Sequence, residues 1–358
     1  MENNRARMLL LIPHLGSGGA ERVMELLARE LPQERFSIHL GILSAVHGAA
    51  VQLPRHVQVH QLHARRVRFA SWRIITLVRR VKPQLIVSCM AHLNFLVLML
   101  RSFYPGGVKI VVRQNGALPE NDSGLAARAY RMLYPLADGI IAQSKAMADE
   151  LCAALPVRRE LVQALNNPIR FPVVAALPKP GSTAIQLLAV GRLVQEKGFD
   201  LLLQALSALR KQGFAMQLTI VGQGPEHERL EKLAAKLALQ GAVSLIGYCE
   251  NPFEAVNADI FVLSSRSEGM PNALLEAAAF SLPIVATPCS RGVADLLLNR
   301  PGTWMAEETS ARALEKAIAA VVAQHRPGQK FRHEFIRPYE CGVAVGAYAE
   351  YFSEVLRR

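Results

Sequence analysis

The chain has few cysteines, no long hydrophobic run and no Asp-x-Asp pair. Its five cysteines are scattered and none forms a C-x-x-C pair. This spacing predicts reduced core thiols in a cytoplasmic protein and disfavours disulfides or a zinc site. The apolar runs "MLLLIP" at the N-terminus and "LNFLVLML" at Leu93–Leu100 are too short for a signal-peptide core or a bilayer span. We therefore expect a soluble protein, or one bound peripherally to the inner face of a membrane.

Several nucleotide-binding motifs are also missing. The glycines of "HLGSGGAER" resemble a dinucleotide fingerprint, but Glu21 stands where the fingerprint needs a small residue. A Walker-type phosphate loop does not occur, and no lysine lies in a context that marks a pyridoxal site. These absences disfavour a nucleotide-dependent oxidoreductase, a P-loop enzyme and a phosphorylase.

What the chain has instead is a regular alternation of short apolar runs and amphipathic segments. In the first half the runs predict strands at Met8–Pro13, Phe36–Leu43, Val57–Leu62, Gln84–Ser88, Val108–Arg113 and Gly139–Ala142. In the second half they predict strands at Ile185–Val190, Met216–Val221, Val243–Ile246, Ile260–Leu263 and Pro283–Ala286. Helices are expected between them, at Ala20–Leu31, Phe69–Val81, Phe199–Gln212, Glu226–Leu239, Asn272–Phe280 and Ser310–Gln324. This alternation is typical of parallel sheets with helices on both faces.

The length of 358 residues suits two domains. The proline-rich stretch "NNPIRFPVVAALPKPGST", Asn166–Thr183, lacks a helical or strand period and is the expected linker. We predict a first domain over residues 1–168, a second over 169–338, and a C-terminal helix in 339–358 that crosses back to the first. Both domains are expected to be doubly wound and Rossmann-like, facing each other across a cleft that holds the ligands.

The net charge is +12, and much of it lies in "HARRVRFASWRIITLVRRVK", His63–Lys82. Phe69, Trp72 and the pair Arg79/Arg80 fit a helix that rests on an anionic membrane surface. An amphipathic helix packed on its own sheet, with a solvated basic face, explains the pattern equally well. The sequence shows no nucleic-acid-binding motif, so a nucleic-acid partner is not expected.

Loops after predicted strands carry the candidate chemistry. Gly18 and Gly19 allow a ligand to approach the start of the helix after the first strand, although a simple strand–helix turn would use them too. In "VGRLVQEKGFD" the cations Arg192 and Lys197 stand five residues apart around a loop and suit a diphosphate, the alternative being a solvated loop.

The stretch "SEGMPNALLEA" places Glu268 before a helix and Glu276 within it. We expect Pro271 in the first helical turn, with the backbone N–H groups of Gly269, Met270 and Asn272 directed at a ligand. Glu268 could then accept hydrogen bonds from sugar hydroxyls and Glu276 from the two hydroxyls of a ribose. Two surface glutamates on a capped helix are the simpler alternative.

Taken in order, "GGAER", "NNPI", "AVGRLVQEKGFD", "VGQGPE" and "SEGMPNALLEA" resemble the retaining family 4 glycosyltransferases, the glycosyl transferases group 1, over nearly the whole chain. The resemblance implies the GT-B fold, with acceptor binding in the first domain and nucleotide-sugar binding in the second. It implies that Arg192 and Lys197 hold the donor diphosphate, that Glu268 approaches the transferred sugar and that Glu276 binds the ribose. It also implies that Gly18 and Gly19 lie beneath the donor phosphate and sugar, with Tyr248 and Cys249 bordering the base.

The same resemblance suggests residues of the first domain. "SCMAHLNF" offers His92 as a catalytic residue facing the sugar, although a lone histidine is more often structural. "VVRQNG" offers Arg113 and Asn115 as acceptor-binding residues, and Arg113 could instead order the cleft.

The expected activity is transfer of a sugar from a nucleotide-sugar, UDP-sugar foremost, to a glycan, with the anomeric configuration retained. Arg192, Lys197 and helix N-termini would stabilise the leaving diphosphate, so neither a metal nor another cofactor is expected. The expected acceptor is a lipid-linked saccharide of a surface polysaccharide or lipopolysaccharide. A soluble small-molecule acceptor, or an inactive sugar-nucleotide-binding subunit, stays open.

Overall fold

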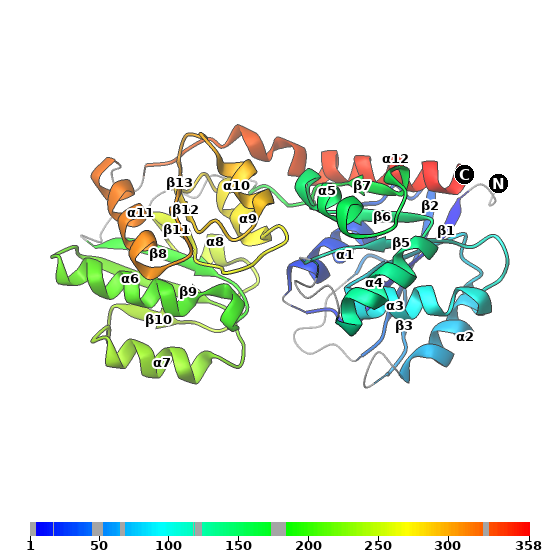
Figure 1. Cartoon of the computed structure of the whole chain (residues 1–358), viewed down its shortest axis with the longest axis horizontal. Helices are drawn as coiled ribbons and strands as arrows, with labels where there is room; N and C mark the ends of the chain where they lie inside the picture. The colour runs from blue at the N-terminus through cyan, green and yellow to red at the C-terminus, as the bar shows by residue number, and fades with distance from the viewer. Residues whose placement is uncertain are drawn as a thin grey trace. The chain divides into compact units, whose positions relative to one another are not determined.

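A computed structural model gives the fold of the chain (Figure 1). The structure describes residues 5–16, 18–44, 53–64, 69–116, 118, 124–172, 184–324 and 329–358. The chain forms two compact units, one of Met1–Pro168 with Pro338–Arg358 (unit 1) and one of Ile169–Arg337 (unit 2). The first change of unit lies inside the expected linker, of which residues 173–183 are outside the described residues.

Unit 1 is built on a parallel sheet of seven strands in the order β3-β2-β1-β4-β5-β6-β7. The strands are β1 (Ala6–Ile12), β2 (Phe36–Ile42), β3 (Gln58–Gln61), β4 (Leu85–Cys89), β5 (Lys109–Arg113), β6 (Gly139–Ala142) and β7 (Val162–Ala164). The α-helices are α1 (Gly19–Glu30), α2 (Ser71–Val81), α3 (Ala91–Met99), α4 (Leu125–Leu133), α5 (Lys145–Ala154) and α12 (Cys341–Arg357). Short 3₁₀ turns are η2 (Arg101–Phe103), η3 (Tyr134–Leu136) and η4 (Arg159–Leu161).

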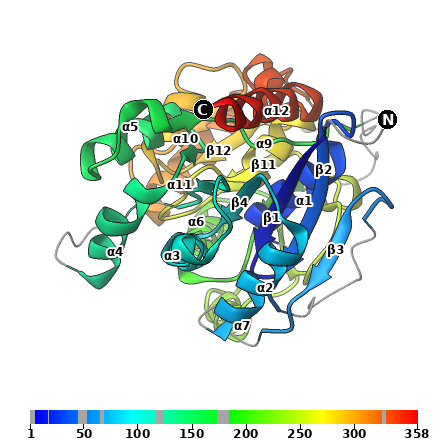
Figure 2. The same cartoon turned by 90° about the vertical axis from the view of Figure 1, so that its right-hand side faces the viewer.

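Both faces of this sheet are covered, which explains why β1 and β4 are almost continuous apolar runs. Side chains of α2, α3, α4 and α5 form one core with the sheet. On the other face α1 packs beside α12, through residues such as Met24 and Phe352. The C-terminal helix is therefore part of unit 1, as Figure 2 shows.

Unit 2 is built on a parallel sheet of six strands in the order β10-β9-β8-β11-β12-β13. The strands are β8 (Ile185–Val190), β9 (Met216–Val221), β10 (Val243–Leu245), β11 (Ile260–Leu263), β12 (Ile284–Ala286) and β13 (Thr303–Met305). The α-helices are α6 (Phe199–Lys211), α7 (His227–Lys236), α8 (Pro252–Ala255), α9 (Asn272–Ala279), α10 (Arg291–Leu297) and α11 (Ala311–Gln324). The 3₁₀ turns are η5 (Gln195–Lys197) and η6 (Glu334–Tyr339).

The predicted α/β class with two doubly wound parallel sheets is confirmed. Four predicted strands, β6, β8, β9 and β11, have the predicted bounds. The prediction missed β7 and β13, which are outermost strands of three residues each. Such short strands contain no apolar run long enough to distinguish them from a loop.

Candidate active site

In unit 2, strand order predicts where a ligand binds. The chain reverses its direction of winding between β8 and β11, so the connections after these two neighbouring strands run to opposite faces of the sheet. A crevice opens between such loops at the carboxyl ends of the strands. The loop after β8 carries Arg192 and Lys197, and the loop after β11 carries Glu268.

Two glycines let the loops of this crevice pack closely. Gly198 has φ +63°, and a Cβ there would lie 2.0 Å from the backbone oxygen of Ser264. A Cβ on Gly222 would lie 1.9 Å from the backbone oxygen of Gly191. Only glycine allows such approaches, so the loops after β8, β9 and β11 form one layer of packed backbone.

Lys197 and Glu268 form an ion pair at the centre of this layer. The Nζ of Lys197 lies 2.5 Å from Oε1 of Glu268, and the Oγ of Ser265 donates a hydrogen bond of 2.8 Å to the same oxygen. The side chains of Lys197 and Glu268 are 22% and 14% exposed. Both are thus within reach of a ligand yet partly shielded from water, which strengthens electrostatic contacts.

A second ion pair holds the two loops together. Arg266 donates two hydrogen bonds of 2.8 Å to the two carboxylate oxygens of Asp200, and a third of 2.8 Å to the backbone oxygen of Gln195. Burial opposes ionisation of Asp200, but the hydrogen bonds and charge of Arg266 outweigh it and lower the pKa of that carboxyl. Ser264 Oγ donates to the backbone oxygen of Lys197 at 2.9 Å. The backbone on both sides of the Lys197 side chain is therefore fixed.

The sequence alone did not identify the Arg266–Asp200 ion pair, the hydrogen bond from Ser265 or the nearby thiol of Cys289. Asp200 lies inside a quoted motif, and Ser265 and Arg266 immediately precede another, but the pairing of Arg266 with Asp200 joins residues 66 positions apart, which one sequence does not reveal. Cys289 lies in the loop after β12, and burial, followed by the charge of Glu268, raises the pKa of its thiol to about 12. A thiol with that pKa is neutral at neutral pH.

The other predicted donor residues lie at the same carboxyl edge. Arg192 is exposed, and no ion pair of its side chain occurs among the residues that the structure describes. Glu276 and Asn272 lie on α9 and are half-buried. Met270 is 6% exposed, so its backbone is better placed than its side chain to meet a ligand.

One detail of this helix differs from expectation. Pro271 is the N-cap of α9, with φ −76° and ψ 112°, and does not belong to its first turn. The helix begins one residue later, at Asn272, so the N–H groups that follow Pro271 remain at its open end.

Tyr248 and Cys249 follow β10, the outermost strand beside β9. Gly222 N–H donates to Gly247 O at 2.6 Å, and Gly191 N–H donates to Val221 O at 3.0 Å. These bonds connect the loop of Tyr248 to the loop of Arg192. Tyr248 is 49% exposed.

In unit 1 the corresponding reversal lies between β1 and β4. The loop after β1 contains His14, whose Nε2 lies 3.0 Å from Oε1 of Glu21 on α1. Glu21 is only 6% exposed, and a Cβ on Gly18 would lie 2.1 Å from its Oε2. The carboxylate thus folds back over Gly18, the N-cap of α1, and occupies the positive end of that helix.

This arrangement bears on Gly18 and Gly19, which were predicted beneath the donor phosphate and sugar. A phosphate at this helix end would face the Glu21 carboxylate and be repelled, whereas a sugar hydroxyl would find an acceptor. Their contact with the donor stays a prediction.

His92 lies in the first turn of α3, the helix that follows β4. Partial burial, and next the charge of His14, lower the pKa of His92. Met90, two residues before, has φ 78° and ψ 131°, a strained conformation for a residue with a side chain. The histidine is therefore presented beside His14 by a strained turn, and its catalytic role stays a prediction.

The expectation for Arg113 is wrong in part. Its side chain is fully buried, so it is not positioned to bind an acceptor. It donates to Asn167 Oδ1 at 2.5 Å, to Tyr348 Oη at 3.3 Å and to Asn115 Oδ1. It therefore ties the end of β5 to the chain just before the unit boundary and to α12, which agrees with the alternative of an ordering role. Asn115 is half-buried and donates to Cys89 Sγ at 2.9 Å.

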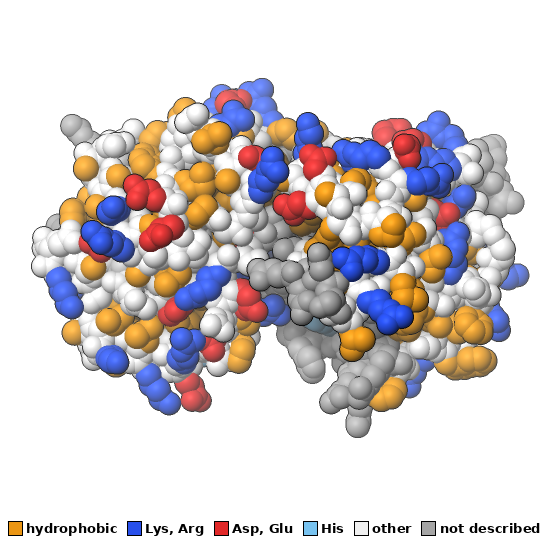
Figure 3. Space-filling view, viewed as in Figure 1, with side chains coloured by type: hydrophobic (Ala, Val, Ile, Leu, Met, Phe, Trp, Pro, Cys, Tyr) orange, Lys and Arg blue, Asp and Glu red, His pale blue; other side chains and the backbone are white. Residues whose placement is uncertain are grey.

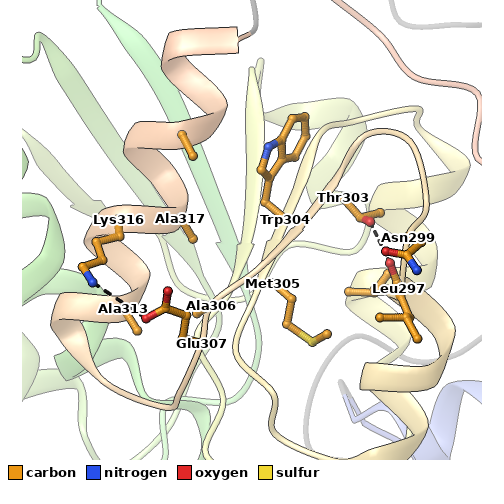
Figure 4. Close-up of a pocket in the computed structure, with 12 residues that line it drawn as sticks. Leu297, Asn299, Thr303, Trp304, Met305, Ala306, Glu307, Ala313, Lys316 and Ala317 are labelled. Carbon is orange, nitrogen blue, oxygen red and sulfur yellow. Dashed lines mark hydrogen bonds and ion pairs between the residues drawn. The ribbon is translucent and has the colours of Figure 1, made fainter.

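A separate groove of about 490 Å³ lies along β13, the edge strand of unit 2 (Figure 4). Trp304 and Met305 line it, and an ion pair of 3.7 Å between Lys316 and Glu307 lies on one side. None of the predicted site residues lines this groove. The packed loops at the switch point remain the candidate site, because the charged groups that suit a diphosphate converge there.

The described parts of the chain lack two further features. There, no group of three or more His, Cys, Asp or Glu side chains is arranged to hold a metal ion. In the same residues, no helix combines the length and apolarity needed to cross a bilayer. The expectation of metal independence stays a prediction.

Comparison with known families identifies the chain. Residues 17–171 match the model described as Glycosyltransferase Family 4, and residues 178–338 match the model described as Glycosyl transferases group 1. The two matches together cover most of both units and leave β1 and α12 of unit 1 outside them. The chain belongs to this family of glycosyltransferases, and the resemblance seen in the sequence is confirmed.

Curated relatives include an uncharacterized glycosyltransferase of Haemophilus influenzae, 35% identical over 38% of this chain and 39% of its own length. A second is a putative colanic acid biosynthesis glycosyltransferase of Escherichia coli, 33% identical over 40% of this chain and 37% of its own. The chain thus matches less than half the length of these two. An N-acetylgalactosaminyltransferase of Campylobacter jejuni, named for a diphospho-undecaprenol-linked acceptor, is 26% identical over 80% of this chain and 82% of its own.

Solved structures share the fold at low identity. A sucrose-phosphate synthase from Thermosynechococcus elongatus aligns with a TM-score of 0.82 and 16% identity, over 99% of this chain and 100% of the other. HepE of Anabaena, in complex with UDP and glucose, aligns with a TM-score of 0.78 and 16% identity over the same shares. These likenesses confirm the GT-B fold.

Proposed function

We propose that the protein transfers a sugar from a nucleoside diphosphate sugar to a lipid-linked glycan, with retention of anomeric configuration and without a metal ion. The observation that carries the proposal is the Lys197–Glu268 pair at the switch point of unit 2, with the exposed Arg192 on the same loop. A cation for the diphosphate and a carboxylate for the sugar hydroxyls stand side by side, as transfer of a sugar from a diphosphate requires.

In this mechanism, negative charge develops on the leaving diphosphate as the bond between it and the anomeric carbon breaks. Lys197 and Arg192 stabilise that charge, which lowers the barrier to transfer. Glu268 accepts hydrogen bonds from the transferred sugar, and Glu276 accepts them from the ribose. The acceptor hydroxyl attacks from the face that the diphosphate leaves, so the configuration is retained.

Uridine diphosphate is the proposed nucleotide. The support is the fold shared with HepE of Anabaena, whose structures contain UDP, glucose or UDP-glucose. The exposed ring of Tyr248 offers a face on which a pyrimidine can stack.

The decisive experiment is calorimetric titration with UDP, GDP and ADP in the presence of EDTA. Wild type is compared with the double variant Arg192→Ala/Lys197→Ala. We expect tight binding of UDP that the double variant loses. Binding of none of the three nucleotides would refute the proposed donor site, and binding that EDTA abolishes would refute its metal independence.

The proposed acceptor is membrane-borne because unit 1 carries most of the net positive charge of the chain, +9 of +12. Residues 35–137 contain fourteen Lys and Arg against two acidic residues, an excess equal to the net charge of +12. Trp72 and Phe69 at the start of α2 are 72% and 64% exposed, and Leu125 on α4 is 88% exposed. Figure 3 shows basic and hydrophobic side chains together over the part of unit 1 where α2 and α4 lie. Arg65, Arg66 and Arg68 lie outside the described residues.

Apolar side chains beside a basic surface are the features with which peripheral proteins bind anionic lipid. The relative named for an undecaprenol-linked acceptor supports a lipid-linked substrate. Sedimentation with anionic vesicles tests this, with Trp72→Ala as the variant and Leu298→Ala, an exposed leucine of unit 2, as the control. We expect only Trp72→Ala to weaken sedimentation. Absence of wild-type binding at physiological salt would favour a soluble acceptor.

A further inference from the structure

In the structure, the cation proposed to hold the diphosphate already has an anionic partner. Lys197 Nζ lies 2.5 Å from Glu268 Oε1, and both side chains are more than three-quarters shielded from solvent. A Cβ on Gly191 would lie 3.2 Å from Cε of Lys197, so the lysine stem runs close over that glycine. Arg192, by contrast, is exposed, and the described residues offer its side chain no ion pair.

The two anions compete for one positive charge. A diphosphate bound at Lys197 would lie close to the Glu268 carboxylate, and like charges at such distances repel strongly where water is partly excluded. A charge-assisted bond to Lys197 stabilises whichever anion holds it. The carboxylate must therefore give up Lys197 when a diphosphate takes it. When the donor carries its sugar, hydroxyls of the sugar replace the lysine as hydrogen-bond donors to Glu268.

We propose that Glu268 and the diphosphate exchange on Lys197, so that the site distinguishes the intact donor from the spent nucleoside diphosphate. The inference rests on the proposed function. With the sugar present, both members of the broken ion pair find new partners. With the nucleoside diphosphate alone, Glu268 loses Lys197 and gains no hydroxyl in return. Its return to Lys197 then promotes release of the product.

The surroundings of the pair suit such an exchange. Ser265 Oγ donates to Glu268 Oε1 at 2.8 Å, so the carboxylate keeps one hydrogen bond when the lysine leaves. The contacts of Arg266 with Asp200 and Gln195 hold the loop on both sides of Lys197. The lysine side chain can then change partner without movement of its backbone.

A double-mutant cycle on affinity for UDP tests the exchange. The variants are Glu268→Gln, Lys197→Met and their combination, all close in size to the native side chains. We expect Glu268→Gln to bind UDP about fivefold more tightly than wild type, because no carboxylate then holds Lys197. In the Lys197→Met background, Glu268→Gln should increase the affinity for UDP by a factor at least about threefold smaller, because there is no lysine to release.

Glu196→Gln is the matched control. Glu196 is an exposed carboxylate next to Lys197 in sequence, so Glu196→Gln removes the same charge as Glu268→Gln but from a side chain outside the ion pair. It should change affinity for UDP by less than about twofold, because exposed charges are screened. Thermal unfolding of each variant establishes that it is folded.

The outcomes separate this inference from the proposed function. If wild type binds UDP and Arg192→Ala/Lys197→Ala does not, the donor site stands. If Glu268→Gln increases the affinity for UDP as much or more in the Lys197→Met background, the carboxylate only repels the diphosphate, and the exchange is overturned. The exchange is also overturned if Glu268→Gln does not increase the affinity in the protein that retains Lys197. If wild type binds no nucleoside diphosphate, the proposed function and the exchange fall together.

Discussion

Gly198 offers the sharpest test of how the donor site is built. It has φ +63° and ψ 24°, and a Cβ there would lie 2.0 Å from Ser264 O, about 1 Å closer than real Cβ atoms approach. Gly198→Ala therefore adds a clash with backbone to the cost of a left-handed alanine. The conformational cost is about 1 kcal/mol and the overpacking about 2 kcal/mol more. We expect the free energy of unfolding of unit 2 to fall by about 3 kcal/mol.

Gly213 provides the matched control. Its φ is +95°, but a Cβ there would have no atom within 4 Å. Gly213→Ala should therefore cost only the conformational part, about 1 kcal/mol. The difference between the two variants isolates the contact between the loops after β8 and β11.

The two tryptophans allow unit 2 to be followed by itself. Trp72 belongs to unit 1 and Trp304 to unit 2, so Trp72→Phe leaves one fluorescent reporter in unit 2. Urea unfolding in that background gives the stability, and calorimetry gives the affinity for UDP. Gly198→Ala should also weaken UDP binding by at least about tenfold, because its clash displaces the backbone beside Lys197. Equal losses of stability for the two variants, or unchanged nucleotide binding in Gly198→Ala, would refute the reasoning.

Three further predictions concern buried groups. Burial, followed by the charges of neighbouring basic residues, lowers the pKa of His39 from 6.5 to about 4. The neutral His39 therefore contributes its full stabilisation of unit 1 above pH 6.5 and loses it as the pH falls toward 4. In urea unfolding, the free energy of unfolding of unit 1 should fall by about 2 kcal/mol between pH 7 and pH 5, and it should fall by less in His39→Gln. Arg113→Met should destabilise unit 1 by about 3 kcal/mol and speed proteolysis of α12, whereas Arg159→Met, in an exposed ion pair, should cost under about 1 kcal/mol. Cys289 is 8% exposed with a pKa of about 12, so iodoacetamide at pH 8 should label it at least about tenfold more slowly than the half-buried Cys249, as mass spectrometry would show.

The sequence contains enough information for most of the fold because the sheets are parallel and covered on both faces. Strands buried in this way are short apolar runs, so β8, β9 and β11 could be located to the residue. Burial explains the failures as well. The outermost strands β7 and β13 have three residues each and half-exposed surroundings, and they leave no such signal.

The candidate site was predictable as a set of residues but not as a set of contacts. Lys197 and Glu268 were assigned to one ligand, yet their ion pair spans 71 positions and depends on which strands are neighbours. Arg113 shows the opposite problem. A basic residue at the end of an apolar strand suggests a ligand, but its partners Asn167 and Tyr348 lie 54 and 235 positions away and enclose it. Pairing over such distances is decided by topology, and a single sequence does not reveal it.

The charges at the two switch points assign different ligands to the two units. In unit 2 the loop after β8 presents an exposed arginine and a lysine that is paired with Glu268, so we expect an anion to gain from binding there. In unit 1 the Glu21 carboxylate already occupies the helix end that would attract an anion, and it holds His14 at 3.0 Å. A phosphate is therefore favoured in unit 2 and disfavoured beside Gly18, where hydroxyl groups fit the available acceptors. The same strand order thus supports two kinds of site, and the placement of one carboxylate decides between them.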